Sequence, residues 1–250
     1  MTRLIGYSKR KKDLAIEHYR VGTDDDRFVI PEILDKDMYQ FRGKLSRFLQ
    51  GRNGHLVDCG AHIGVFSRLC VEYMSDVSIL HCFEPQPENY RLLRKNLSAF
   101  EEEEPGRIVM HQKAVALENG TIRLFNGSDT GRFTCVPVVN HNDSIEVECI
   151  DLADYLRKLD KVLILKLDLE GFEARILNVA AEKILRNVEV LILEEHHEPI
   201  NHDLIKANGF RLWYEPTTLD PSRRFVRTWL RKSFGLSSSS SRHFVYKRME

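Results

Sequence analysis

Residues 57–64 read Val-Asp-Cys-Gly-Ala-His-Ile-Gly, and a second apolar run ends in Phe-Glu-Pro at residues 83–85. The first stretch has the form of a strand, a glycine turn and the beginning of a helix. Glu84 follows Asp58 by 26 positions, which is the spacing of two acids at the tips of neighbouring parallel strands. This layout predicts a nucleoside site in which Glu84 accepts both hydroxyls of a ribose.

The glycine turn indicates which nucleoside is bound. Gly60 and Gly64 would let the backbone pass close to the ligand and to the helix behind it. A dinucleotide site needs a middle glycine for its pyrophosphate, but His62 stands in that position. Asp58 would repel an anion and would attract an ammonium, directly or through water. S-adenosylmethionine (SAM) has an ammonium and a free ribose diol, so it fits better than NAD. Alternatively, Asp58 caps the helix and Glu84 is a solvated strand end.

Three motifs together resemble the FkbM-type methyltransferases, a family of class I SAM-dependent enzymes, many of which methylate oxygens on sugars or natural products. The motifs are residues 57–64, residues 83–85 and Lys-Leu-Asp-Leu-Glu-Gly at residues 166–171. The resemblance covers residues 56–195. It implies an α/β, Rossmann-like class I methyltransferase fold, with a seven-stranded, mostly parallel sheet and helices on both faces.

The resemblance also implies where the cofactor lies. The methionine end would lie on the glycine turn, the ribose on the tip of the next strand, and the adenine beside the end of the third strand. The predicted cofactor-binding residues are Asp58, Gly60, Ala61, His62, Gly64, Glu84, Pro85, Gln112, Ala114 and Asp168.

Asp168 and Glu170 are the first candidates for acting on the methyl acceptor. Along an extended strand their side chains point the same way, together with that of Lys166. A hydroxyl acceptor benefits from a general base, and we expect Asp168 to orient or activate it. Two alternatives stay open: Lys166 pairs internally with an acid and locks the turn, and Glu170 caps the helix that begins near Phe172.

Residues 194–198 read Glu-Glu-His-His-Glu, which invites a metal interpretation. Neighbouring strand residues face opposite sides, however, and no distant histidine or cysteine pair completes a ligand set. We therefore predict no metal. We expect His196 or His197 to reach the cleft as a substrate ligand or base, with His196 as the catalytic candidate. Alternatively, the segment is a polar strand end.

Strand and helix patterns alternate along the chain, as in a parallel sheet covered on both faces. Residues 32–50 have helical spacing, so we predict an N-terminal helical extension over 1–52 and a methyltransferase domain over 53–250, within one globular domain. Residues 121–125 and 144–149 are expected to be extra strands. The main strands are expected near 55–59, 78–83, 108–113, 162–168, 188–193, 210–214 and 243–247, with helices near 64–75, 87–98, 151–158, 172–186 and 201–207.

Composition narrows the class of protein. The 250 residues include 37 basic and 37 acidic side chains, and this balance argues against a broad surface for polyanions. The five cysteines form no C-x-x-C pair, so buried thiols and a reducing compartment are expected. No apolar run is long enough to span a membrane, and we expect a cytoplasmic protein.

The leading hypothesis is therefore transfer of a methyl group from SAM to a hydroxyl oxygen of a small molecule or glycan. Three alternatives stay open: a cap-type 2′-O methyltransferase acting on RNA, a nicotinamide oxidoreductase, and a non-catalytic SAM-binding module. Lys166 and the basic segment 223–232 give the RNA alternative some support. The segment would also suit a lid, a phosphate grip, a membrane-surface helix or a docked amphipathic helix.

Overall fold

The computed structural model describes residues 16, 18–19, 30–31, 33–126, 133–134, 144–196, 198–216 and 242–249. The basic segment 223–232, His197 and Cys135 lie outside these residues. The other cysteines, at positions 59, 70, 82 and 149, are buried free thiols, as expected. No helix among the described residues is long and apolar enough to cross a membrane.

The main sheet confirms the predicted α/β fold, with seven strands in the order β10-β11-β9-β8-β1-β2-β3. All pairings from β9 to β3 are parallel, whereas β11 is antiparallel to both of its neighbours. The strands are β1 (His55–Cys59), β2 (Ile79–Phe83), β3 (Ile108–His111), β8 (Val162–Leu167), β9 (Val188–Glu195), β10 (Phe210–Tyr214) and β11 (Arg242–Arg248).

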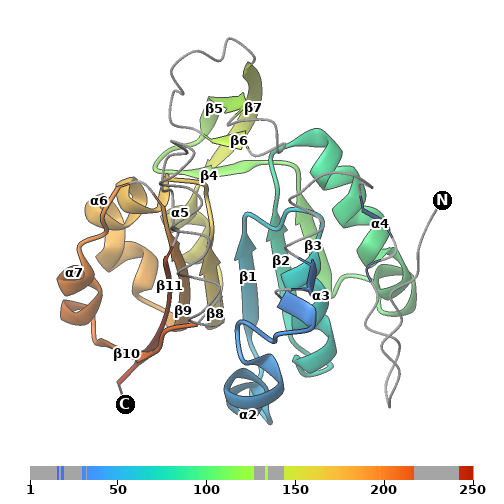
Figure 1. The fold of residues 1–250 in the computed structure, drawn as a ribbon, viewed down its shortest axis with the longest axis horizontal. Helices are drawn as coiled ribbons and strands as arrows, with labels where there is room; N and C mark the ends of the chain where they lie inside the picture. Colours follow the sequence, from blue (N-terminus) through green and yellow to red (C-terminus); the bar gives the residue numbers. More distant parts are fainter. Residues whose placement is uncertain are drawn as a thin grey trace, which may run out of the picture.

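Helices cover both faces of this sheet (Figure 1). One face packs against α3 and α4, and the other against α5, α6 and α7, so the strands separate two apolar clusters. The central strand β8 is buried along its whole length, as expected of a parallel strand with both faces covered. The helices are α3 (Val65–Tyr73), α4 (Pro87–Glu103), α5 (Leu152–Leu156), α6 (Glu173–Leu185) and α7 (His202–Ala207).

The segment before β1 differs from the single helix expected over 32–50. It contains helical residues up to Leu34, a π-helical turn η1 (Phe41–Leu45) and the short α2 (Ser46–Leu49). The helical conformation is interrupted at Asp37 and Gln40, which have φ of 48° and 51°. The Asp37 carboxylate accepts the amides of Phe41 and Arg42 at 2.7 and 2.9 Å, so a local side-chain cap competes with helix continuation.

The apolar face of that segment is buried as its periodicity predicted, in the same cluster as α3. The division of the chain at residue 52 stays a prediction.

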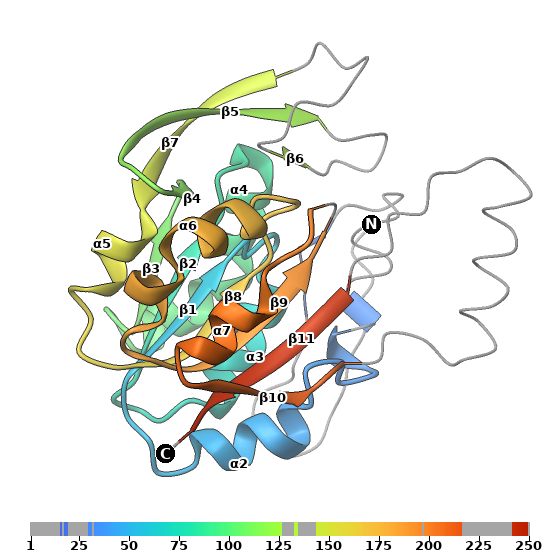
Figure 2. The same ribbon diagram turned by 90° about the vertical axis from the view of Figure 1, so that its left-hand side faces the viewer.

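A second sheet stands beyond the carboxyl ends of β1 and β2 (Figures 1 and 2). It has the order β4-β7-β5-β6. The two extra strands expected from the sequence are confirmed as β5 and β7, but their assembly into a separate sheet was not predicted. Its strands are β4 (Ala114–Ala116), β5 (Gly120–Asn126), β6 (Phe133–Thr134) and β7 (Ser144–Asp151).

Candidate functional site

The candidate site lies where β2, β1, β8 and β9 end. These strands are adjacent in the sheet and run parallel, so their carboxyl ends meet at one edge. The predicted residues at these ends, from Asp58 to His196, are therefore brought together. The exceptions are Gln112, which is exposed between β3 and β4, and Ala114, which is buried in β4.

Four amides of the glycine turn donate hydrogen bonds within the protein. Gly60 and Ala61 both donate to the carbonyl of Phe83, at 3.0 and 2.9 Å, and Gly64 donates to the carbonyl of Ala61 at 2.8 Å. The amide of His62 donates to Glu84 at 2.8 Å. Because these amides are occupied within the protein, they do not form the anion-binding cradle that a pyrophosphate requires.

Glycine is required at two points of this turn. Gly60 has φ of 86°, and a Cβ built there would lie 1.8 Å from the carbonyl oxygen of Asp168. Gly64 has φ of 90°, and its Cβ would lie 2.8 Å from the side chain of Leu93 in α4. The first glycine thus lets the tips of β1 and β8 interlock, and the second lets the turn pack on a helix.

Glu84 links the turn to the next strand. Its carboxylate accepts the amides of His62 and Gln86, at 2.8 and 2.9 Å, and lies 3.4 Å from the side-chain amide nitrogen of Asn89. Burial raises the pKa of Glu84 to about 7, although these hydrogen bonds lower it. The side-chain oxygen of Asn89 is buried and has no hydrogen-bond partner among the described residues. Pro85, next in the chain, is half-buried.

Asp58 lies deeper than the sequence suggested. Its side chain is 0 % exposed, accepts the hydroxyl of Ser67 at 2.6 Å and lies 3.4 Å from the Lys166 ammonium. The cation beside Asp58 therefore belongs to the protein, and no surface of Asp58 is left for direct contact with a ligand.

Lys166 is a buried cation with two hydrogen-bond acceptors and a second carboxylate nearby. Its ammonium lies 3.0 Å from Asp168 Oδ2, 3.2 Å from the carbonyl of Gly60 and 3.4 Å from Asp58 Oδ1. Burial would lower the pKa of Lys166, but the charges of Asp168 and Asp58 raise it well above its usual value. Lys166 therefore stays charged and fixes one oxygen of Asp168, which is the internal pairing that the sequence had left open.

Glu170 departs from the direction shared by Lys166 and Asp168. It has φ of 52°, and the following Gly171 has φ of 106°, so the strand geometry ends before Glu170. Glu173, rather than Glu170, accepts the amides that precede the helix: Leu169 at 2.5 Å and Gly171 at 3.0 Å. The sequence analysis missed Glu173, although an acid in the first turn of a predicted helix was an available signal.

His196 is enclosed by carboxylates. Its Nδ1 lies 2.9 Å from Glu173 Oε1, and its Nε2 lies 3.5 Å from both Glu170 and Glu194. Burial would lower the pKa of His196, but the hydrogen bond to Glu173 and the charges of Glu194 and Glu170 raise it to about 10. His243 on β11, which the sequence analysis also missed, lies 2.9 Å from Glu194.

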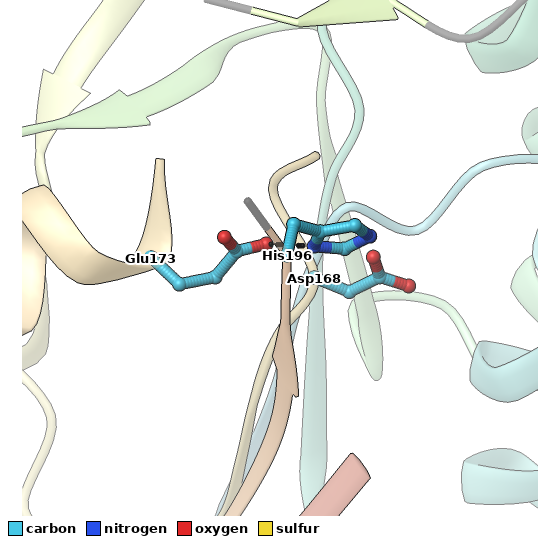
Figure 3. A group of neighbouring side chains, drawn as sticks. All are labelled: Asp168, Glu173 and His196. Atoms are coloured by element: carbon cyan, nitrogen blue, oxygen red, sulfur yellow. Dashed lines mark hydrogen bonds and ion pairs between the residues drawn. The ribbon is translucent and has the colours of Figure 1, made fainter. Parts of the chain in front are cut away.

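One group of side chains could hold a metal ion. Asp168, Glu173 and His196 each present one donor atom, and these atoms lie within 4.8 Å of one another. Figure 3 shows the imidazole of His196 with the carboxylates of Glu173 and Asp168 beside it.

Comparison with known proteins gives the family of the chain. Residues 58–234 match the model of the methyltransferase FkbM domain. No curated protein matches the sequence significantly.

Among solved structures, the chain is similar to methyltransferase FkbM from Methylobacillus flagellatus, with 20 % identity and a TM-score of 0.41 over 57 % of this chain and 32 % of that one. It is also similar to the fibrillarin pre-rRNA processing protein of Methanococcus jannaschii, with 14 % identity and a TM-score of 0.48 over 87 % and 76 %.

A further similar structure is magnesium protoporphyrin IX methyltransferase from Synechocystis with bound SAM, with 12 % identity and a TM-score of 0.44 over 92 % and 100 %. The family match extends over most of the chain and includes residues 58–64, 83–85 and 166–171 of the three motifs. The chain therefore belongs to the FkbM methyltransferase family.

Proposed function

We propose that this protein transfers a methyl group from SAM to a hydroxyl oxygen of a small molecule or glycan. The observation that carries the cofactor assignment is the contrast between two neighbouring strand tips. The turn after β1 has occupied amides, whereas the tip of β2 presents the buried acceptor Glu84. A neutral diol suits this pair better than a pyrophosphate does.

Glu84 fits the ribose of SAM because it has the right chemistry and position. No ion pair of Glu84 is found among the described residues, and burial raises its pKa to about 7. Two ribose hydroxyls would donate to the carboxylate and favour its charged form. The amides of His62 and Gln86 hold both carboxylate oxygens in place. The role of Asp58 is then indirect, through Ser67 and Lys166.

Asp168 is the residue that we assign to the acceptor. SAM, when bound, supplies a methyl group that is already activated, so the protein must chiefly align the acceptor and take its proton. Lys166 binds Oδ2 of Asp168 and leaves Oδ1 for a hydroxyl. Burial, with the charge of Glu194, raises the pKa of Asp168, which makes its carboxylate a better base than a free aspartate.

His196 suits a binding role better than the role of base. A pKa of about 10 keeps its imidazole protonated at neutral pH, so it has no lone pair with which to accept a proton. As a cation it holds Glu170, Glu173 and Glu194 together and can donate to an acceptor oxygen.

The RNA alternative loses one of its two supports. A catalytic lysine must reach its substrate, but Lys166 is buried, donates to two acceptors and pairs with the charge of Asp58. The second support, the basic segment 223–232, lies outside the described residues.

Transfer of labelled methyl from SAM to a panel of sugars, small polyols and capped RNA tests the proposal. We expect labelling of a hydroxyl compound and a loss of turnover of at least about 100-fold in Asp168→Asn, as for removal of a general base. Labelling of RNA alone, with salt-sensitive RNA binding, would favour the RNA alternative. SAM binding without transfer to any acceptor would favour a non-catalytic module.

A further inference from the structure

We propose that Asp168, Glu173 and His196 form a binding site for one divalent cation at the place where the acceptor would lie. The sequence alone predicted no metal, because no ligand set is complete within residues 194–198. The structure adds ligands from two other elements: the loop after β8 and the first turn of α6. Only the role of the cation in methyl transfer rests on the proposed function.

The spacing of the three donor atoms fits a shared ion. They lie within 4.8 Å of one another, and Glu173 Oε1 is 2.9 Å from His196 Nδ1. Around an ion with bonds of about 2.1 Å, neighbouring ligand atoms lie about 3 to 3.5 Å apart. Ion binding would have to draw the three atoms together from separations of up to 4.8 Å.

The two carboxylates are held in place by neighbouring groups, as metal ligands commonly are. Lys166 binds one oxygen of Asp168 at 3.0 Å. The amides of Leu169 and Gly171 bind both oxygens of Glu173, which is only 1 % exposed. The backbone around α6 therefore orients Glu173 toward His196 before any ion is present.

The charges around His196 also favour a cation. Carboxylates of Glu170, Glu173 and Glu194 lie within 3.5 Å of its ring nitrogens, and Asp168 adds a fourth. The nearby lysine, Lys166, is shared with Asp58. The carboxylates still outnumber the cations when His196 and His243 are both counted as protonated, and buried charges need partners.

The donor set indicates the class of ion and its use. One imidazole and two carboxylates suit ions such as Mn²⁺ and Zn²⁺, which accept nitrogen and oxygen ligands together. The ion would replace the proton that His196 carries in its absence, so binding would release a proton to solvent. Three protein ligands leave coordination positions for oxygens of the acceptor. An ion there would lower the pKa of a bound hydroxyl and so increase its nucleophilicity. With the ion bound, Asp168 would hold the ion and orient the acceptor through it, and the proton of the ion-bound hydroxyl would pass to solvent.

Calorimetric titration of the chelator-treated full-length chain with Mn²⁺, without SAM or acceptor, tests the site. We expect one Mn²⁺ per chain, with affinity at least tenfold weaker in His196→Ala and in Asp168→Asn. Glu173 is left unchanged because its carboxylate also caps the backbone. His202→Gln is the matched control, since His202 at the start of α7 is also a histidine beside a carboxylate, 3.1 Å from Glu195, and lies outside the ligand set. It should bind as the wild type does.

Circular dichroism shows whether His196→Ala and Asp168→Asn fold. If one of them does not, the Mn²⁺ affinity of the other tests the site. Absence of saturable Mn²⁺ and Zn²⁺ binding to the folded wild type would overturn the proposal. So would wild-type affinity in a folded His196→Ala or Asp168→Asn variant. A parallel titration with SAM separates the two proposals: SAM binding without Mn²⁺ binding removes only the cation site, and Mn²⁺ binding without SAM binding removes only the cofactor assignment.

Discussion

Glu84 is the residue on which the cofactor assignment depends most. It is buried, held by the backbone amides of His62 and Gln86, and placed at a strand tip where a ribose diol can donate to it. Each of these features follows from the three residues after β2 and from the turn after β1, so a change at position 84 should affect ligand binding more than the fold.

We expect Glu84→Gln to weaken the binding of SAM and S-adenosylhomocysteine about 10- to 100-fold, because a hydrogen bond to a charged group contributes about 1.5–3 kcal/mol. The measurement is calorimetric titration of both proteins at neutral pH. Glu88→Gln, an exposed acid in the first turn of α4, is the control and should bind normally. Unchanged affinity in Glu84→Gln would remove Glu84 from the site.

At the scale of elements, the interlocked tips of β1 and β8 depend on Gly60. We expect Gly60→Ala to lower the free energy of unfolding by at least about 2 kcal/mol, since the new Cβ meets the backbone of Asp168 in addition to the strain of a positive φ.

Gly106→Ala is the matched control for Gly60→Ala. Gly106 has a similar φ of 83° but nothing within 4 Å of its Cβ position, so it should lose only about 1 kcal/mol. Urea unfolding of both variants gives the comparison. If the two variants lost the same free energy of unfolding, the tips of β1 and β8 would be able to move apart and accommodate the new Cβ.

A chain of hydrogen bonds joins β1, β2, β3 and α5. His55 lies 2.9 Å from His81, His81 lies 2.8 Å from the Tyr155 hydroxyl, and Tyr155 lies 2.9 Å from His111. Burial, with the charges of His55 and His111, lowers the pKa of His81 to about 4. Because the folded pKa lies below the usual value of 6.5, the unfolded chain binds this proton more tightly.

Stability should therefore be lost as the pH falls from about 6.5 to about 4, and His81 alone can account for at most about 3 kcal/mol of that loss. His81→Gln keeps a hydrogen-bonding side chain without the titration. We expect its free energy of unfolding, from urea titrations at pH 7, 5 and 4, to change less than that of the wild type. Parallel curves for the two proteins would contradict the assignment to His81.

Strands and helices that follow from the spacing of apolar residues could be predicted. A break caused by a side chain that competes for backbone amides could not. The apolar runs of β1, β2, β8 and β9 and the spacing of α4 and α6 identified these elements directly. The break before η1 arises because Asp37 caps the amides of Phe41 and Arg42, and an apolar face continues across it. The second sheet depended on which strands pair with one another, and a local pattern identifies a strand but not its partner.

For the whole molecule, the parallel order of the strands explains how much of the site the sequence could predict. Side chains at the ends of parallel strands converge whatever their contacts, so Glu84, Asp168 and His196 could be placed together. Their partners could not, because the contacts of Lys166 with Asp58 and of His196 with Glu173 are made between elements. The contact with Lys166 is the reason that Asp58 stabilises the site from within the protein and does not contact the ligand.

The most direct test of the central claim is calorimetric titration of the purified chain with SAM, S-adenosylhomocysteine and NAD. The account predicts micromolar binding of both adenosyl ligands and no binding of NAD, because the turn amides are occupied while Glu84 can accept a ribose diol. Binding of NAD alone would contradict it.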